Sequence, residues 1–427
     1  MSARTRPIPA VSSPPSCSAA AANSSEQELE IAAMSQSYVT PLLHPDSPLD
    51  EKARALVEML FEKEARLMDA LPTDDPLDEK RKRRVELTRV EILGQAEAIR
   101  NTIREARAET IETAKHFAGQ GIKRIIMTGC GDSLAVMFGV RDIFEMLLGI
   151  PAEPIQALDY AYYASRTTGP DTLVITLSSS GMTTRTVEAM LIARSLGAKT
   201  LALSNTPGSA LMTESDRGLM IRAERKGWPT QASTAAIALL AQFAIDWARA
   251  ANPDDGRVEG LQAAFDAAPD QMAEVTETLE PAIVEIAKRE ADRGFYLYAA
   301  GGPAFASAMF GSAKVKECSP DQGLAIPLEE FHHYNSQKEG DPLFLIAPDG
   351  PSIFRARDTA FEGKRWKGRI YSIVTGEQAI LDAYSDAVLR LPAVPECLSA
   401  LVYSVPVQLF AHHVAMEKFR RAEQGRG

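Results

Sequence analysis

The chain has 427 residues, of which 45% are hydrophobic and 24% are charged, as is usual for soluble globular proteins. This length predicts two domains. Its 57 acidic residues outnumber its 46 lysines and arginines, which gives a net charge of −11. Such a charge speaks against a nucleic-acid partner or an acidic membrane surface, because both attract basic proteins.

The cysteines and the apolar segments indicate the cellular compartment and whether the chain holds a metal or spans a membrane. Cys17, Cys130, Cys318 and Cys397 form no CxxC pair, which argues against a disulfide framework or a structural zinc site and favours a reducing cytoplasm. No HExxH motif or carboxylate cluster predicts another metal site. The apolar stretch 398–415 is interrupted by polar residues and a proline, and it falls short of the roughly 18 apolar residues of a membrane span.

The first part of the chain has the composition of a tail. Residues 1–47 begin rich in Ser, Ala and Pro, lack the apolar core of a secretory signal, and are interpreted as disordered. We expect translation to start at Met34, in preference to a transit peptide. Helical periodicity follows over residues 48–115. The basic run Lys80–Arg84 is interpreted as the solvated start of a helix rather than a localisation signal or a phosphate-binding patch.

Strand–loop–helix units follow this helical extension. Short apolar segments at 124–128, 171–177 and 200–203 each run into a polar loop before a helical stretch. This alternation predicts right-handed βαβ crossovers and a parallel sheet covered by helices on both faces. Ligands are then expected beyond the carboxyl ends of the strands.

The unit is repeated. Segments 129–139 and 301–311 share both end glycines and a Met-Phe-Gly ending, and the Ser-Asp pairs at 215–216 and 385–386 recur at nearly the same offset. Two matches at one offset predict a pair of related α/β domains. The predicted division is a tail at 1–47, a helical extension at 48–115, a first domain at 116–251, a helical linker at 252–292 and a second domain with the C-terminal helix at 293–427.

The loop at 178–184 combines three serines, a glycine and two threonines at the start of a helix. Its hydroxyl and backbone N–H groups suit an anion such as phosphate, although Ser and Thr also cap helices for structural reasons. Ser133, Thr206 and Ser209 follow other strands and are candidates for the same pocket. No lysine follows the glycine as in a Walker A motif, and Gly129-x-Gly131 lacks a third glycine, so ATP, NAD and cofactors in general are not expected.

Acid–base candidates lie in the second domain. Glu317 follows Lys314 on a predicted helix, and His332 and His333 come soon afterwards. A carboxylate near a histidine suits proton transfer between carbon and oxygen at neutral pH. From these residues alone, the favoured interpretation is a solvated glutamate and histidines that lie on the surface or pack in the core.

Four motifs together resemble the sugar isomerase (SIS) family: GCGDS, LSSSGMTTRTVEA, LSNTPGSAL, and GSAKVKE followed by EEFHH. The resemblance extends over about 90–414 and is strongest to the isomerase half of glucosamine-6-phosphate synthase and to fructosamine-6-phosphate deglycases. It implies an α/β fold of two tandem SIS domains, each a flavodoxin-like parallel sheet between helical layers, after an N-terminal helical extension.

The resemblance also implies roles for individual residues. Glu317 would move a proton between C1 and C2 with Lys314 beside it, and His333, commonly supplied by the neighbouring subunit, would open the sugar ring in a homodimer. The residues implied to bind the substrate, chiefly at its phosphate, are Ser133, Ser178, Ser179, Ser180, Thr183 and Ser233.

Departures from the family pattern restrict the reaction. Asp132 stands where a small or hydroxyl residue is usual, and its carboxylate would repel phosphate unless it binds a sugar hydroxyl instead. No lysine follows Lys418 to form an imine with a ketose, and the first 120 residues predict no glutamine-hydrolysing domain. We therefore do not expect glutamine-dependent synthesis.

The leading interpretation is a sugar-phosphate aldose–ketose isomerase or a fructosamine-6-phosphate deglycase. Both act by ring opening and C1/C2 proton transfer through an enediol or enolamine. The sequence leaves open an isomerase of a sulfonated sugar such as sulfoquinovose, and a non-catalytic sugar-phosphate-sensing regulator. A sensor has no chemical need for Glu317 and His333, so this pair favours the enzyme.

Overall fold

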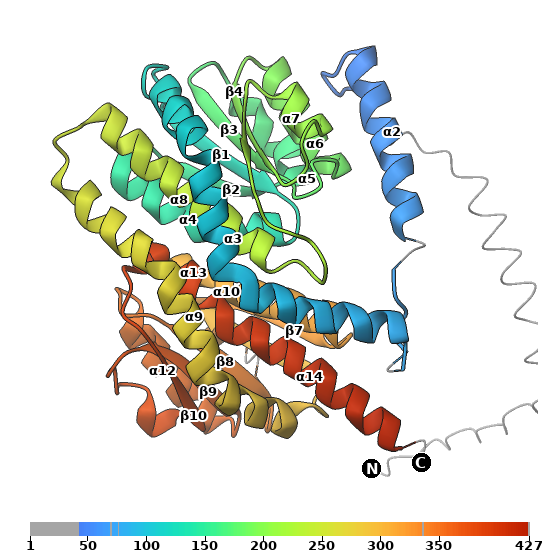
Figure 1. Cartoon of the computed structure of the whole chain (residues 1–427), viewed down its shortest axis with the longest axis vertical. Helices are drawn as coiled ribbons and strands as arrows, with labels where there is room; N and C mark the ends of the chain where they lie inside the picture. Colours follow the sequence, from blue (N-terminus) through green and yellow to red (C-terminus); the bar gives the residue numbers. More distant parts are fainter. Residues whose placement is uncertain (1–41, 69–70, 76, 335–336, 426–427) are drawn as a thin grey trace, which may run out of the picture. The chain divides into compact units, whose positions relative to one another are not determined.

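The computed structural model describes residues 42–427 except 69–70, 76, 335–336 and 426–427. The fold lies in the unit that runs from Pro48 to Gly427, and it contains two parallel five-stranded sheets (Figure 1). The predicted α/β class with two tandem domains is confirmed. The predicted tail lies, up to residue 41, outside the described residues.

Two helices precede the first sheet, α2 (Glu51–Met68) and α3 (Glu79–Ala118). Asp78 caps α3 by accepting hydrogen bonds from the backbone N–H groups of Lys80 and Arg81, which satisfies donors that a helix start leaves unpaired. Contact with α6 fixes α2, because Glu64 accepts hydrogen bonds from Thr184 N at 3.2 Å and Oγ1 at 2.6 Å.

The first sheet has the strand order β2-β1-β3-β4-β5. Its elements are β1 (Arg124–Gly129), α4 (Asp132–Leu148), β2 (Ala152–Gln156), α5 (Ala157–Asp159), a π turn (Tyr160–Ala164), a 3₁₀ turn (Ser165–Thr167), β3 (Thr172–Leu177), α6 (Thr184–Ser195), β4 (Lys199–Ser204), α7 (Ala210–Glu214), β5 (Arg217–Met220) and α8 (Gln231–Ala251). All six residues of the central strand β3 are buried, as is typical of a parallel sheet covered on both faces.

The second sheet has the order β10-β9-β8-β6-β7, which is the same topology counted from β6. Its elements are α9 (Gly256–Glu290), β6 (Phe295–Ala300), a 3₁₀ turn (Gly302–Ala304), α10 (Phe305–Cys318), β7 (Gln322–Pro327), α11 (Leu328–His333), β8 (Pro342–Ala347), α12 (Ile353–Arg365), β9 (Arg369–Thr375), a 3₁₀ turn (Asp382–Tyr384), β10 (Ala387–Leu391), a 3₁₀ turn (Glu396–Leu398), α13 (Ser399–Val402) and α14 (Ser404–Gln424).

The two Ser-Asp pairs occupy equivalent places in the two sheets. Asp216, just before β5, accepts a hydrogen bond from Thr200 N at 2.8 Å. Asp386, just before β10, accepts one from Ile370 N at 2.8 Å. Thr200 and Ile370 are each the second residue of the neighbouring strand, so the predicted duplication extends to the same strand-edge contact.

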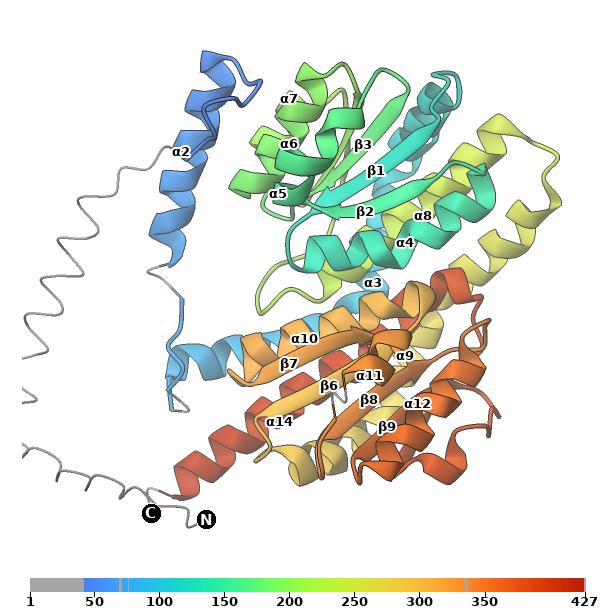
Figure 2. The same cartoon turned by 180° about the vertical axis from the view of Figure 1, so that it is seen from behind.

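Helices cover both faces of each sheet (Figures 1 and 2). In the first domain α3, α4 and α8 cover one face, and α5, α6 and α7 cover the other. In the second domain α9, α10 and α14 cover one face, and α11 and α12 the other. A single hydrophobic cluster runs through α3, α4, α8, α10 and α14, so the inner helices of both domains share one core.

The repeated glycine of the first motif allows the two domains to approach closely. A Cβ atom at Gly139 in α4 would lie 2.9 Å from Ala400 Cβ and 3.1 Å from Ala306 Cβ in α10. Phe138 and Phe305 add an edge-to-face contact with ring centroids 5.7 Å apart. This crossing brings the beginning of α4 to the end of α10, which positions the site described below.

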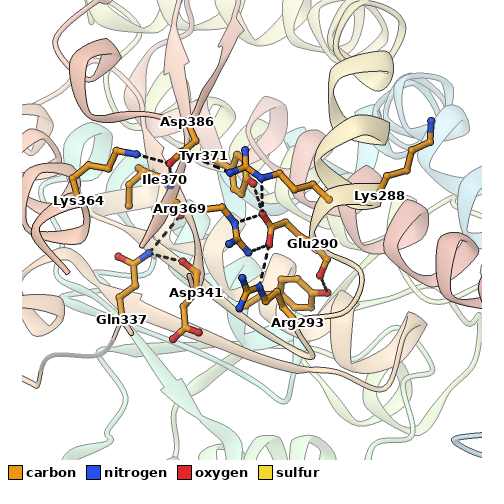
Figure 3. Close-up of polar contacts among 12 residues, drawn as sticks. Lys288, Glu290, Arg293, Gln337, Asp341, Lys364, Arg369, Ile370, Tyr371 and Asp386 are labelled. Carbon is orange, nitrogen blue, oxygen red and sulfur yellow. Dashed lines mark hydrogen bonds and ion pairs between the residues drawn. The ribbon is translucent and has the colours of Figure 1, made fainter. Parts of the chain in front are cut away.

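A buried ion cluster holds α9 to the second sheet (Figure 3). Glu290, at the end of α9, is fully buried and pairs with the guanidinium of Arg369 at the start of β9. The Tyr371 hydroxyl donates to the same carboxylate, and Arg293 lies 4.0 Å away. A buried carboxylate needs such partners to offset its lost hydration, so the cluster is structural.

One helical stretch, Glu396–Gln424, is long and apolar enough to cross a bilayer when only length and composition are considered. This differs from the shorter run counted in the sequence, because the helix continues to Gln424. Of its most apolar window, 94% is buried inside the fold. His412 in this stretch is 4% exposed and packs in the core, as its apolar surroundings predict.

Candidate active site

A cavity of about 250 Å³ opens where β1 and β3 end and where α4, α6 and α8 begin. It lies at the carboxyl ends of the strands, as parallel sheets favour. Glu317, from the end of α10, makes the second domain part of the same cavity. The lining residues are Cys130, Asp132, Ser133, Val136, Leu177, Ser179, Ser180, Thr183, Ile221, Arg225, Pro229, Ala232, Ser233, Ala236 and Glu317.

The serine-rich loop forms one wall of this cavity. Ser179, Ser180 and Thr183 line it, while Ser178 lies behind them and bonds Thr183 Oγ1 at 2.9 Å. Ser179 Oγ is buried without a hydrogen-bond partner among the described residues. Free hydroxyl and N–H donors at the start of α6 give this wall the character of an anion site.

The third loop supports this wall instead of lining the cavity. Thr206 Oγ1 donates to Ser179 O at 3.3 Å, and Ser209 Oγ donates to Ser204 Oγ at 3.4 Å. Gly181 has φ +64°, and a Cβ atom there would lie 1.9 Å from Ser209 Oγ. Thr206 and Ser209 therefore fix the serine loop, and neither is among the residues that line the cavity.

Ser133 lies in the first turn of α4 and lines the cavity. Its position depends on Gly129, where a Cβ atom would lie only 2.7 Å from Ser133 Cβ. The glycine before the loop thus lets α4 start directly against the end of β1.

A buried lysine joins the acidic groups of the cavity. Lys314 is 1% exposed, and its Nζ lies 2.7 Å from Asp132 Oδ2. The same ammonium contacts Glu317 Oε2, and Ser233 Oγ donates to Asp132 Oδ2 at 3.2 Å. The structure thus brings Asp132, Ser233, Lys314 and Glu317 together, and the carboxylate of Asp132 is partnered by a cation.

This arrangement sets the ionisation of Glu317. Burial is the largest influence and raises its pKa above the ordinary carboxyl value, while Lys314 lowers it and Asp132 raises it. Burial alone would lower the pKa of Lys314, but Asp132 and Glu317 outweigh it and raise that pKa, so the lysine stays charged. The Glu317 side chain remains 29% exposed, enough to meet a ligand in the cavity.

The basic run of α3 reaches the back of this site. Arg81 is 5% exposed, donates to the backbone oxygen of Glu317 at 2.8 Å and pairs with Asp74 at 2.9 Å. Arg84 lies 3.5 Å above the ring of Trp228. The interpretation of this run as a solvated helix start is therefore wrong for Arg81, which is buried and supports the backbone of Glu317.

His333 lies apart from the residues that line the cavity. It ends α11, its side chain is 59% exposed, and its Nε2 lies 3.5 Å from Glu329 Oε1. Within one chain the structure therefore does not bring His333 to Glu317. Its neighbour His332 is held by Thr359 Oγ1 at 3.0 Å.

Two lining residues with a thiol or a charged side chain, Cys130 and Arg225, were missed in the sequence. Cys130 contacts Gln156 and Thr186, and burial raises its pKa, which disfavours the reactive thiolate. Arg225 is exposed on the loop between β5 and α8. The only signal for Arg225 in the sequence was a cation shortly before Ser233, which by itself does not indicate a site.

Sequence comparisons identify the relatives of this chain. It is 27% identical over 347 residues to glutamine–fructose-6-phosphate aminotransferase [isomerizing] of Yersinia pseudotuberculosis and 30% identical over 356 residues to that of Shewanella oneidensis. Each match covers 79% of this chain and 57% of the relative. The chain therefore spans little more than half the length of these relatives.

Structural comparisons agree in the fold. The C-terminal domain of glucosamine-fructose-6-phosphate aminotransferase from Francisella tularensis superposes with a TM-score of 0.71 at 23% identity, covering 78% of this chain and 96% of that one. Tagatose-6-phosphate ketose/aldose isomerase from Escherichia coli gives 0.65 at 18% identity, covering 77% and 93%. The SIS domain family model matches residues 120–246 and 290–418. The chain therefore belongs to the SIS domain family and carries two such domains in tandem.

Proposed function

We propose that this protein is a sugar-phosphate isomerase or deglycase that moves a proton between C1 and C2 of an open-chain sugar phosphate. The observation that carries the proposal is that Glu317 and the serine loop line the same cavity of about 250 Å³. An anion site and an acid–base carboxylate are thereby within reach of one small ligand. The relatives' names include fructose 6-phosphate, which supports this substrate class.

In this proposal the serine wall holds the phosphate. Ser133, Ser179, Ser180 and Thr183 donate hydrogen bonds to its oxygens, with Ser178 holding Thr183 in place. Charged acceptors gain more from such bonds than neutral ones. Asp132, whose charge is balanced by Lys314, binds a sugar hydroxyl together with Ser233. Binding of the phosphate at the serine wall then positions C1 and C2, at the other end of the sugar, for reaction.

Glu317 is the acid–base catalyst. Its carboxylate takes the proton from one carbon, an enediol or enolamine forms, and the same group returns the proton to the adjacent carbon. Lys314 lowers the pKa of Glu317 against the opposing effect of burial, and its ammonium holds the carboxylate in position. With a hydroxyl at C1 the product is the isomeric sugar phosphate, and with an amine at C1 water addition releases the amine.

His333 is proposed to open the sugar ring from the neighbouring subunit of a homodimer. Its exposed position at the end of α11 suits a residue that acts in a partner's cavity, because there it is free to approach another chain. The proposed setting is the cytoplasm, whose reducing conditions keep thiols free. Cys130, Cys318 and Cys397 are free thiols in the structure.

Proton NMR in deuterated water tests the proposal. Purified protein would be incubated with fructose 6-phosphate, glucosamine 6-phosphate, a fructosamine 6-phosphate and sulfoquinovose, with the C1 and C2 signals followed over time. Deuterium entry or amine release with a phosphorylated sugar is expected. If sulfoquinovose is the only sugar turned over, the substrate carries a sulfonate and not a phosphate. If sugars bind but none exchanges protons, the protein is a sensor and not an enzyme.

A further inference from the structure

The loop between β5 and α8 forms part of the cavity rim. Ile221, Arg225 and Pro229 from this loop line the cavity, and so do Ala232 and Ser233 at the start of α8. Ser233 bonds Asp132, which in turn pairs with Lys314 beside Glu317. The loop therefore leads directly into the end of the cavity where the acid–base groups lie.

Contacts with α3 hold this loop in one conformation. Glu91, which is fully buried, accepts hydrogen bonds from the backbone N–H groups of Lys226 at 2.5 Å and Gly227 at 2.8 Å. Trp228 N donates to Thr88 Oγ1 at 2.8 Å, and a Cβ atom at Gly227 would lie 2.3 Å from Thr88 N. Arg225 thus belongs to a rim whose backbone is held by hydrogen bonds to α3.

The charges of this segment single out Arg225. Arg222 pairs with Glu105 at 3.3 Å, and Lys226 pairs with Glu224. Arg225 has no ion-pair partner in the part of the chain that the structure describes, and it is the one cation among the described residues that line the cavity. The serine wall contains no cation, and Lys314 is committed to two carboxylates.

We propose that Arg225 binds a carboxylate carried by the substrate at its reacting end, so that the substrate is an amino acid joined through nitrogen to C1 of a 6-phosphorylated ketose. This inference rests on the proposed function and narrows it to the deglycase reaction. A guanidinium matches a carboxylate in geometry and charge. The phosphate occupies the serine wall, so Arg225, which lines the same cavity, is left for a second anion.

The reaction balances with water as the only co-reactant. Glu317 takes a proton from C1 and delivers it to C2, while the N–H proton passes to the C2 oxygen. The C2 carbonyl thereby becomes a hydroxyl, and a double bond forms between C1 and the nitrogen. Water adds to C1, and the C1–N bond breaks with its electron pair going to the nitrogen. The nitrogen leaves protonated as the free amino acid, and C1 becomes the aldehyde of an aldose 6-phosphate.

Binding of three ligands shows whether Arg225 binds the carboxylate or the phosphate of the substrate. The first is the glycine adduct of fructose 6-phosphate, the second is its glycinamide counterpart without a carboxylate, and the third is fructose 6-phosphate. Dissociation constants would be measured by calorimetry for the wild type, Arg225→Met and Arg225→Lys. Lys226→Met serves as the matched control, because it removes the neighbouring cation that pairs with Glu224. Amine release from the two adducts would be followed by NMR.

The wild type is expected to bind the glycine adduct about tenfold more tightly than the glycinamide adduct. Arg225→Met should remove this preference and leave the affinity for fructose 6-phosphate unchanged. Arg225→Lys should keep part of the preference, and Lys226→Met all of it. An equal loss of affinity for all three ligands would assign Arg225 to the phosphate and overturn the proposal, as would no loss for any ligand.

Failure of the two proposals can be told apart. If the wild type binds and exchanges fructose 6-phosphate but does not distinguish the two adducts, only the role of Arg225 is wrong. If none of the three ligands is bound or exchanged, the proposed function itself is wrong.

Discussion

Lys314 Nζ lies 2.7 Å from Asp132 Oδ2, so a buried cation of the second domain is balanced by a carboxylate at the start of the first domain's α4. The same ammonium contacts Glu317. The close approach of α4 and α10 at Gly139 helps to bring the two residues together. The proposed acid–base group, Glu317, is therefore positioned by an interaction between the two repeats, and both repeats contribute to the cavity.

Replacing the lysine should be far more damaging than replacing its exposed neighbour on α10. Lys314→Met leaves the Asp132 and Glu317 carboxylates without their shared cation, which should abolish turnover and lower the free energy of unfolding by about 3 kcal/mol. Lys316→Met, on the solvent side of α10, should change neither. Urea denaturation and deuterium exchange into fructose 6-phosphate would measure both effects, and a fully active Lys314→Met would disprove the role of the lysine.

The phosphate wall predicts a selective loss of affinity. Ser179→Ala removes a hydroxyl that has no protein partner, so stability should be unaffected while affinity for fructose 6-phosphate falls about tenfold. Binding of unphosphorylated fructose should not change. Ser195→Ala, at the far end of α6 and exposed, is the control. Calorimetry with both sugars checks this, and an equal loss for the two would remove the wall from phosphate binding.

The pH dependence of turnover should reflect the raised pKa of Glu317. The base must be ionised, so kcat/KM should fall as pH drops through a pKa above the ordinary glutamate value of about 4.3. The Asp132 carboxylate contributes to that elevation, hence Asp132→Asn should move the acidic limb to lower pH. Rate profiles of both proteins test this, and an acidic limb at the same pH in Asp132→Asn would contradict it.

A shared site predicts complementation between inactive variants. Glu317→Gln and His333→Ala should each be inactive alone. After unfolding and refolding as a mixture, one site of every mixed dimer has both native residues, and random pairing should restore roughly a quarter of wild-type turnover. Refolded single variants are the controls. Restoration is measured by proton exchange, and its absence in a mixture that does form dimers would place His333 outside the partner's site.

The fold could be predicted because its signals are local. Strands, polar loops and helices alternate with clear periods, and the repeat is visible in Gly129–Gly139 and Gly301–Gly311. The edge strands β2 and β5 went unnoticed, since Ala152–Gln156 contains a proline and a glutamate and Arg217–Met220 has only four residues including a glycine, which strand propensity disfavours.

The site was predictable only in part. The serines stand in one loop and have a recognisable pattern, whereas Arg81 meets the backbone of Glu317 across 236 residues. No periodicity encodes such a contact. The same holds for Arg225, which is held at the cavity rim because Glu91, far away in the sequence, accepts hydrogen bonds from the neighbouring backbone N–H groups. The charge of Asp132 looked unfavourable in the sequence because its partner Lys314 lies in the other domain.

The most direct test of the account is a paired measurement on Glu317→Gln. Its dissociation constant for fructose 6-phosphate and its rate of deuterium entry at C1 would be compared with those of the wild type in one preparation. The account predicts an unchanged dissociation constant within about threefold and a rate reduced at least about a hundredfold, the usual range for a lost general base. Retained exchange in Glu317→Gln would contradict it, and an equal loss of binding and exchange would show that Glu317 is structural.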